Sequence, residues 1–400
     1  MTSEPGSFAR ATIEERKPAI VAEVLALSPK REVIRHALQA LVEEIRHLPI
    51  SPPPPGVPLH AEWVAHYGLW EGSTWLELPW YFAEAYFYLR LLSAIGYFAG
   101  LHPDPFARQK ASLLAQSGPV VASMARIERA VGDLPPAEAF TLLARRSLWG
   151  NRTDLSNVAV TERHRGDPTH SDQPPPVVDD CRSAYEDLLR APEAEVVFLC
   201  DNAGPELVCD LHLAAWLLDH AAERVALEVK PQPFFVSDAM AREVDATIAY
   251  LQGCDDPAVQ GVGDRLKDAR SRGTLSVRDH PFWCGPDHYD SLPQDLWDRL
   301  SRAALVISKG DVNYRRFLRD RHWPFDTPIE RALPPFPAPV LLLRTFKGEL
   351  AAGLSREAVE QLSRADPDWL VSGRQGVAQY RAQARAGRDG ATASRPTGGT

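Results

Sequence analysis

The sequence has few cysteines and no long hydrophobic run. Its five cysteines are odd in number and form no CxxC pair, which argues against a disulfide framework or a zinc knuckle. No stretch reaches the roughly 18 uninterrupted apolar residues of a membrane-spanning helix. The N-terminus lacks the basic and apolar regions of a signal peptide. We therefore expect reduced thiols and a soluble, cytoplasmic protein.

The sequence also has fewer basic than acidic residues. The chain has 44 Lys and Arg residues against 53 Asp and Glu residues, and its formal net charge is −9. Nucleic acids and anionic membranes both require a basic surface, so we expect neither as a partner. A small phosphorylated molecule could still be bound by a local cluster of basic residues.

Several familiar catalytic motifs are missing. The chain has no GxGxxG or GxxxxGK[ST] loop, no HExxH pair and no GxSxG turn. These absences argue against a standard dinucleotide site, a P-loop, a zinc protease and a serine hydrolase. No DxD follows a strand in the way typical of phosphatases that form an aspartyl-phosphate.

What is present indicates an α/β protein with a helical N-terminal region. In residues 1–160 apolar side chains recur at helical spacing, whereas in 180–375 helical patterns alternate with short apolar runs. That alternation predicts βα units and a mainly parallel sheet. The last segment, 380–400, is rich in Arg, Ala, Gly, Ser and Thr, and we expect it to be disordered.

Four apolar runs in the second half stop abruptly at polar residues. They are residues 196–200, 233–236, 305–308 and 340–343. Runs of this length and composition are typical of strands buried on both faces of a parallel sheet. Because ligands bind outside the carboxyl ends of such strands, the polar residues that follow are expected to converge at one edge.

Two of these runs lead into oxygen-bearing side chains. Asp201 and Asn202 follow the first run, and Asp238 follows the second. Carboxylate and amide oxygens are ligands suited to Mg²⁺ or Mn²⁺. The ordinary alternative is an Asx turn and a helix cap. We interpret the three residues as a candidate metal site with positions left open for a phosphate.

The other two runs lead into basic residues. Lys309 and Arg315 flank Asp311 after the third run, and Lys347 belongs to an Arg-Thr-x-Lys sequence after the fourth. Lys309 and Arg315 could neutralise the charge of a phosphate, while Asp311 could orient a water molecule or hydrogen-bond a sugar hydroxyl. A solvated loop and a surface salt bridge are the ordinary alternatives.

Polar residues also occur beside the aromatic-rich N-terminal stretch. Glu84 and Arg90 could form a structural ion pair, and Asn151 with Asp154 could cap a helix. The alternative is that Asn151 and Asp154 lie over the sheet edge and hydrogen-bond sugar hydroxyls. The helical region would then act as a substrate lid.

Taken in order, these segments resemble the metal-dependent damage-control phosphatase family. The matching sequences are Asp201-Asn202-Ala203-Gly204-x-Glu206, Val236-Ser237-Asp238 and Lys309-Gly310-Asp311-x-Asn313-Tyr314-Arg315. Arg344-Thr345-Phe346-Lys347 is similar to the signature of the subfamily that acts on sugar phosphates. Two upstream segments also match, Trp80-x-x-x-Glu84-x-Tyr86-x-Tyr88-x-Arg90 and Trp149-Gly150-Asn151-x-x-Asp154-Leu155-Ser156. The resemblance covers about residues 60 to 375.

The resemblance implies a Rossmann-like three-layer α/β sandwich with a mainly parallel sheet and a helical N-terminal region. It implies a divalent metal at Asp201, Asn202 and Asp238. It also implies substrate contacts from the following residues: Asp201, Asn202, Asp311, Val312, Asn313, Tyr314, Arg315 and Lys347. Ser308 and Val312 depart slightly from the family pattern.

These observations together predict a hydrolase for phosphate monoesters of small sugars, and the resemblance implies substrates such as fructose 1-phosphate or fructose 6-phosphate. The expected cofactor is Mn²⁺, Mg²⁺, Co²⁺ or Ni²⁺, and the expected catalytic residues are Asp201 and Asp311. Whether water or Asp201 is the nucleophile is left open. Two alternatives remain: an S-adenosylmethionine-dependent protein carboxyl methyltransferase, and a sugar-phosphate-binding protein without catalysis.

Overall fold

The computed structural model describes residues 4–27, 32–150, 174–191 and 195–383. At its centre is a six-stranded sheet in the order β3-β2-β1-β4-β5-β6, parallel except for the antiparallel edge strand β6. The strands are β1 Glu195–Leu199, β2 Arg224–Val229, β3 Leu275–Asp279, β4 Ala303–Lys309, β5 Val340–Thr345 and β6 Gly376–Arg381. This is the strand order of a Rossmann-like fold, as the resemblance implied.

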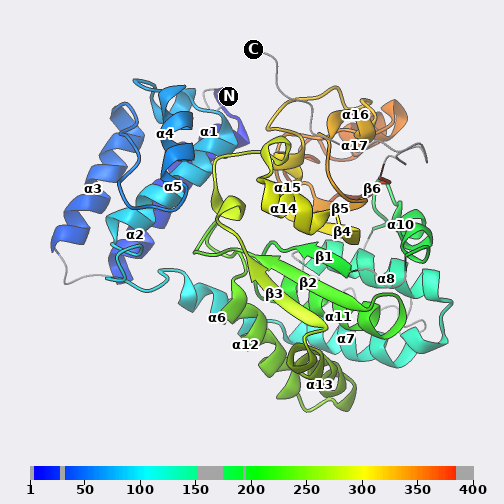
Figure 1. Cartoon of the computed structure of the whole chain (residues 1–400). Helices are drawn as coiled ribbons and strands as arrows, with labels where there is room; N and C mark the ends of the chain where they lie inside the picture. The colour runs from blue at the N-terminus through cyan, green and yellow to red at the C-terminus, as the bar shows by residue number, and fades with distance from the viewer. Residues whose placement is uncertain (1–3, 28–31, 151–173, 192–194, 384–400) are drawn as a thin grey trace.

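Side chains alternate between the two faces of the sheet and so build two apolar layers. Val196 and Phe198 of β1 join one core, whereas Val197 and Leu199 join the core on the opposite face. Because both faces are buried, the strand is apolar at almost every position, and an uninterrupted run marks it in the sequence. The expected three-layer sandwich is confirmed (Figure 1).

Helices cover both faces. The first layer contains α7 Gly118–Ala130, α8 Pro136–Trp149, α10 Cys181–Leu188, α11 Pro205–His220, α12 Ala241–Gln252 and α13 Pro257–Arg272. The second contains α14 Gln294–Leu300, α15 Gly310–Phe317 and α16 Ile329–Ala332, with α17 Arg356–Ala365 packed at its side. The site described below lies between these layers, where α11 and α15 begin.

Five of the remaining helices form an aromatic-rich bundle at the N-terminus, shown in blue in Figure 1. They are α1 Phe8–Ala11, α2 Lys17–Leu27, α3 Glu32–His47, α4 His60–Gly68 and α5 Trp80–Ala94. Helix α6, Ala107–Ala115, follows the bundle, and its Leu114 packs against the core of the sheet. The apolar core of this bundle ends near Phe106, whereas residues from Val120 onward join the core of the sheet. Helices α7 and α8 thus pack with the sheet layers although they precede residue 160. The division of the chain near residue 160 stays a prediction.

Two expectations about the bundle and the sheet are wrong. Glu84 does not pair with Arg90: its carboxylate binds the buried Lys17, and Arg90 binds Glu44. Residues 233–236 do not form a strand, and the strand of this βα unit is β2. The backbone has positive φ at Phe235 (44°) and Val236 (67°), which no extended strand allows.

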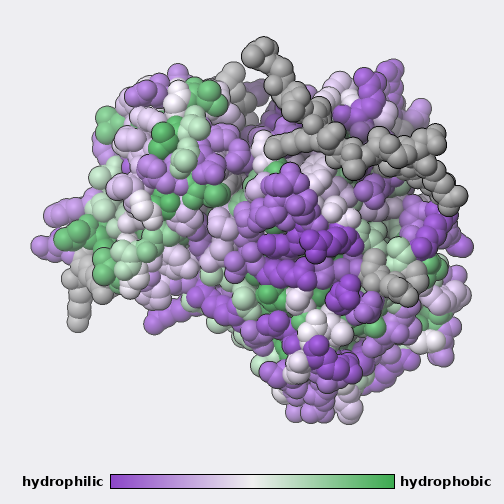
Figure 2. Space-filling view, in the orientation of Figure 1, coloured by the Kyte–Doolittle hydropathy of each residue, from purple (hydrophilic) through white to green (hydrophobic). Residues whose placement is uncertain are grey.

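Surface apolar residues gather mainly on the N-terminal bundle, as the green areas over it in Figure 2 show. The exposed large apolar side chains of the described residues are Leu27, Val33, Leu48, Val64, Leu69, Leu101 and Leu189. Within the described part of the chain, no helix combines the length and apolar character needed to cross a membrane.

Candidate active site at the carboxyl edge of the sheet

The site lies where the chain direction across the sheet reverses. From β1 the chain passes through α11 to β2 on one side, whereas β4 pairs with β1 on the other side. The segments after β1 and β4 therefore diverge at their carboxyl ends. This is the position at which open α/β sheets bind ligands.

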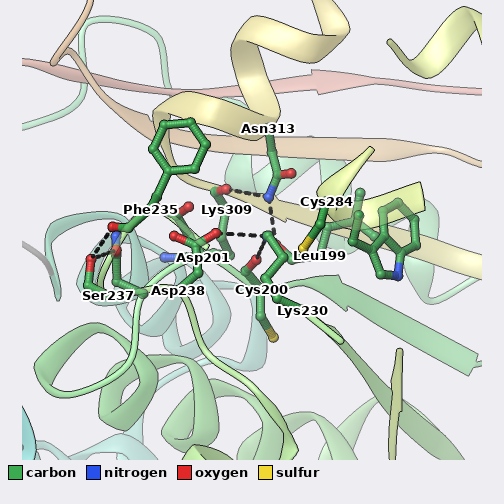
Figure 3. A network of polar contacts seen from close by, with 12 residues as sticks. Leu199, Cys200, Asp201, Lys230, Phe235, Ser237, Asp238, Cys284, Lys309 and Asn313 are labelled. Carbon is green, nitrogen blue, oxygen red and sulfur yellow. Dashed lines mark hydrogen bonds and ion pairs between the residues drawn. The ribbon is translucent and has the colours of Figure 1, made fainter. Parts of the chain in front are cut away.

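Asp201 and Asp238 come together at this edge (Figure 3), and Asn202 lies beside them. Asn202 and Asp238 form an isolated antiparallel bridge, and the Ala239 amide donates to the Asp201 carbonyl oxygen at 2.8 Å. The Asn202 amide nitrogen donates to Asp201 Oδ2 at 2.7 Å, and its Oδ1 accepts from the Ser237 hydroxyl at 2.5 Å. The structure thus brings the three expected metal ligands to one place.

Gly310 allows the Asp201 carboxylate to lie against the start of α15. Its φ of 83° favours glycine, and a Cβ at this position would overlap the carboxylate oxygens of Asp201. The carboxylate is therefore packed against the backbone of the β4–α15 turn. Any other residue at 310 would displace it.

Lys309 is buried among carboxylates and does not face the open edge. Its ammonium group lies 3.3 Å from Glu206 and 3.0 Å from Asp210, and it also donates to the Ser147 carbonyl oxygen. Burial disfavours the ammonium form, but Asp210 and Glu206 outweigh this effect and raise the pKa of Lys309. Contrary to the expectation that Lys309 binds a phosphate, its ammonium group is paired with buried carboxylates of the protein.

Six ionisable side chains at this edge form what we call the strand-end cluster: Asp201, Glu206, Asp210, Asp238, Lys230 and Lys309, all at most 6% exposed. The cluster has two more carboxylates than ammonium groups. Burial raises the pKa of Asp201, and the charges of Glu206 and Asp238 raise it further. Burial also raises the pKa of Asp238 to about 6, although Lys230 opposes the shift. With four carboxylates close to two ammonium groups, the cluster favours the uptake of positive charge.

The cluster fits a divalent cation. Asp238 Oδ2 is buried 3.3 Å from the Lys230 ammonium but makes no hydrogen bond within the described residues. The donor atoms are carboxylate and amide oxygens, which Mg²⁺ and Mn²⁺ prefer. In the described residues no three His, Cys, Asp or Glu side chains form a metal-binding group by themselves. A metal here would therefore need the amide oxygen of Asn202 as well as the two Asp carboxylates.

Asp311, at the start of α15, is fixed by Arg344. The Arg344 Nε donates to Asp311 Oδ1 at 2.7 Å. The same guanidinium donates to the carbonyl oxygens of Gly348 and Leu350, and it is only 1% exposed. One buried arginine thus ties Asp311 to the loop that carries Lys347. This explains why the Arg-Thr-x-Lys sequence starts with arginine.

Arg315 lies on the same side as Asp311 and is 4% exposed. Its Nη1 donates to Asp320 at 2.6 Å, whereas its buried Nε has no hydrogen-bond partner among the described residues. Nη2 lies close to Gly348, where an added Cβ would be 2.6 Å away. A buried guanidinium with an unused edge is suited to binding an oxyanion.

The other expected substrate-binding residues divide into two groups. Asn313 and Tyr314 are buried, and their polar groups bind inside the fold. The Asn313 amide donates to the Lys309 carbonyl oxygen and accepts from the Tyr289 hydroxyl. The Tyr314 hydroxyl donates to Gln379. A contact from either to a substrate would have to come from its backbone. Lys347 and Val312 are only partly buried.

Lys347 makes no hydrogen bond or ion pair with the described residues, and its stem lies against Gly373. Its charge lowers the pKa of Asp201, although burial raises that pKa more. Val312 packs against the core of the N-terminal bundle. Asn151 and Asp154 lie outside the described residues, so the proposed lid stays a prediction.

Four residues of this region were not singled out as site residues from the sequence: Glu206, Asp210, Arg344 and Asp320. Glu206 and Arg344 belong to sequence segments that resemble the family, and this membership could have marked them as site residues. No sequence pattern marks Asp210 or Asp320, because their partners Lys309 and Arg315 come near them only through the fold.

Comparison with known proteins identifies the family. The model of the damage-control phosphatase ARMT1-like domain matches residues 12–362. This chain belongs to that family. Among curated relatives, damage-control phosphatase ARMT1 of Xenopus laevis is 32% identical over 336 residues, which cover 77% of this chain and 76% of the relative. The mouse protein of the same name is 31% identical, with coverage of 76% and 75%.

The human damage-control phosphatase ARMT1 is 30% identical over 339 residues, covering 77% of this chain and 75% of the relative. Among solved structures, a crystal structure of a DUF89 family protein from Pyrococcus horikoshii superposes with a TM-score of 0.47 at 13% sequence identity. The superposition covers 93% of this chain and 96% of that one.

Proposed function

We propose that this member of the damage-control phosphatase family hydrolyses phosphate monoesters of small sugars and requires a divalent metal. The observation that carries the proposal is that two buried polar groups at the carboxyl edge of the sheet, one anionic and one cationic, each have an atom without a hydrogen-bond partner in the described residues. Asp238 Oδ2 is a buried acceptor, and Arg315 Nε a buried donor, and neither has a hydrogen-bond partner in the described residues. A cation at the first and a phosphate at the second would satisfy both.

Asp201, Asn202 and Asp238 would hold the cation. When bound, such an ion supplies Lewis-acid polarisation of a phosphoryl oxygen. Lys309 compensates the neighbouring carboxylates Glu206 and Asp210, which leaves Asp201 to the cation, whereas Lys230 lies 3.3 Å from the ligand carboxylate of Asp238. The excess of two carboxylates in the strand-end cluster matches the charge of one divalent ion.

The basic side would bind the phosphoryl group. Arg315 offers the edge formed by Nε and Nη2, and Lys347 offers an ammonium group that no described residue occupies. Arg315 is fixed in place by Asp320 before a substrate arrives, so it needs little reorganisation as charge develops on the phosphoryl oxygens. Asp311, held by Arg344, is placed to accept a proton from a water molecule or to orient a sugar hydroxyl.

The experiment is phosphate release from a panel of hexose and pentose phosphates after chelation and re-addition of Mg²⁺, Mn²⁺, Co²⁺ or Ni²⁺. We expect release that depends on the added metal and is lost in Asp238→Asn. Absence of release from every substrate with every metal would contradict the proposal.

The same samples separate the alternatives. Tight S-adenosylmethionine binding without a metal requirement would favour a methyltransferase. A sugar-phosphate complex that persists unhydrolysed for hours in the presence of metal would favour a binding protein.

A further inference from the structure

The N-terminal bundle reaches the basic side of the site through Asp320. Its Oδ1 accepts from Arg315 Nη1 at 2.6 Å, and its Oδ2 accepts from the backbone amide of Tyr81, in the first turn of α5, at 2.9 Å. The carboxylate thus has one oxygen on each partner. Both ionised side chains are nearly buried, at 5% exposed for Arg315 and 6% for Asp320. Asp320 therefore connects the start of α5 to Arg315.

Trp80 contacts the same arginine over its face. The guanidinium carbon of Arg315 lies 4.1 Å from the centroid of the Trp80 ring. The indole nitrogen donates to the Thr12 hydroxyl at 3.0 Å, which fixes the orientation of the ring. Tryptophan is the best aromatic partner for a cation, and burial strengthens such a contact.

Together these contacts decide which part of Arg315 is available. Asp320 occupies Nη1 and Trp80 covers one face, while Nε has no hydrogen-bond partner among the described residues and Nη2 lies beside Gly348, where Asp311 Oδ2 also comes close. Two parallel N–H groups on one guanidinium edge match two oxygens of a phosphate. The contacts made by the bundle leave that edge free.

We propose that Trp80 and Asp320 are positioning residues that orient Arg315 toward the phosphoryl group, and that the N-terminal bundle is thereby part of the active site. The inference rests on the proposed function, because it takes Arg315 to bind a phosphoryl group. The sign of the Asp320 charge supports a geometric role. A carboxylate beside a phosphate site repels the phosphate, so Asp320 aids binding only by fixing the arginine.

The test is calorimetric titration of the full-length protein, in the presence of Mg²⁺, with inorganic phosphate. We expect Trp80→Leu and Asp320→Asn each to weaken phosphate binding about tenfold, in the range of a desolvated cation–π contact or a charge-assisted hydrogen bond. Trp80→Phe keeps an aromatic face and should restore most of the affinity. If Trp80→Leu does not fold, Asp320→Asn still decides the question.

Trp75→Leu is the matched control. Trp75 is buried in the same core and donates to Glu44, on the side of the bundle formed with α3. We expect this variant to lose thermal stability while its folded form keeps wild-type phosphate affinity. An equal loss of affinity in Trp75→Leu would overturn the proposal, since the effect would then be general damage to the bundle. Tighter or unchanged binding in Asp320→Asn would overturn it as well.

Turnover assays on the same variants keep the two proposals apart. If the wild type releases no phosphate from any sugar phosphate but the binding pattern holds, the proposed function fails and the positioning role stands. If the wild type is active and the variants bind phosphate as it does, the positioning role fails alone.

Discussion

Two polar clusters in the sheet layers differ in how completely their buried groups are satisfied. The strand-end cluster leaves Asp238 Oδ2 and Asp210 Oδ2 without hydrogen-bond partners in the described residues. The second, which we call the helix-layer cluster, consists of Glu128, Arg146, His212 and Arg265 on α7, α8, α11 and α13. There both ring nitrogens of His212 and both carboxylate oxygens of Glu128 are bound, and Arg265 Nε, which makes no hydrogen bond with the described residues, lies 3.0 Å from Asp219 Oδ2.

The difference indicates what each cluster is for. A network whose buried side chain is fully paired, as His212 is, stabilises and orients the helices that contribute to it. A network that keeps buried acceptors unpaired costs stability, and such groups call for an explanation such as an ion that completes them. We therefore expect substitutions in the strand-end cluster to change activity, and substitutions in the helix-layer cluster to change stability.

The largest effect is expected from Asp201→Asn. The change keeps the shape of the side chain but removes the charge that would hold the cation. Turnover of sugar phosphates should fall by at least about 10²–10³-fold, the loss typical of removing one electrostatic group from an active site. The melting temperature without metal should not fall, because burial and two neighbouring carboxylates already disfavour that charge. A variant with wild-type activity would remove Asp201 from the mechanism.

The second prediction concerns metal binding measured without turnover. At a metal concentration 100 times the Kd, wild-type protein should gain about 2.7 kcal/mol of stability, by linkage between binding and folding. This gain should appear as a rise in melting temperature after chelated protein is reloaded. Asp238→Asn should show little or no rise, whereas Glu128→Gln should respond like the wild type. The comparison between the clusters fails if both variants respond alike.

Gly310→Ala tests the close packing of the turn against Asp201. The positive φ should cost about 1–2 kcal/mol for any residue with a Cβ. The overlap with the carboxylate should in addition lower metal affinity and activity. Gly273→Ala is the matched control, since Gly273 has a φ of 78° and no atom within 4 Å of an added Cβ. It should lose similar stability and keep full activity, and a parallel loss of activity would argue against the overlap.

Sequence patterns predicted the fold better than they predicted the site. The runs at 196–200, 305–308 and 340–343 are strands because burial on both faces makes them apolar throughout. Residues 233–236 are equally apolar for another reason. Phe234 and Phe235 pack into the core of the N-terminal bundle, and a run of four residues does not distinguish the two environments.

At the site, the sequence indicated which residues gather but not which atoms are free. Lys309 and Arg315 have the same charge and lie in one short segment. The fold buries the first among carboxylates and leaves the second with an unused edge. The partners responsible, Asp210 and Asp320, are brought there by helix packing, which leaves no local pattern. Residue type and spacing therefore could not separate the two roles.

The smallest effect is expected in the helix-layer cluster and depends on pH. Arg146 donates to His212 Nδ1, so the ring must be neutral and must donate from Nε2 to Glu128. Burial lowers the pKa of His212. Burial alone would raise the pKa of Glu128, but His212 and Arg265 outweigh it and lower the pKa to about 2. In both residues the unfolded chain takes up a proton at a higher pH than the folded protein does.

Stability should therefore fall as the pH drops, first below about 6.5 through His212 and then from about 4.5 toward 2 through Glu128. Glu128→Gln should cost about 1 kcal/mol at pH 7, because it weakens a charge-assisted pair while one acceptor remains. This difference should shrink as the pH falls below about 4.5, where the carboxylate of the unfolded chain becomes protonated. Denaturant unfolding at several pH values measures it. A difference that stays constant with pH would contradict the depressed pKa, and a loss of kcat/KM would show that this cluster, too, serves the site.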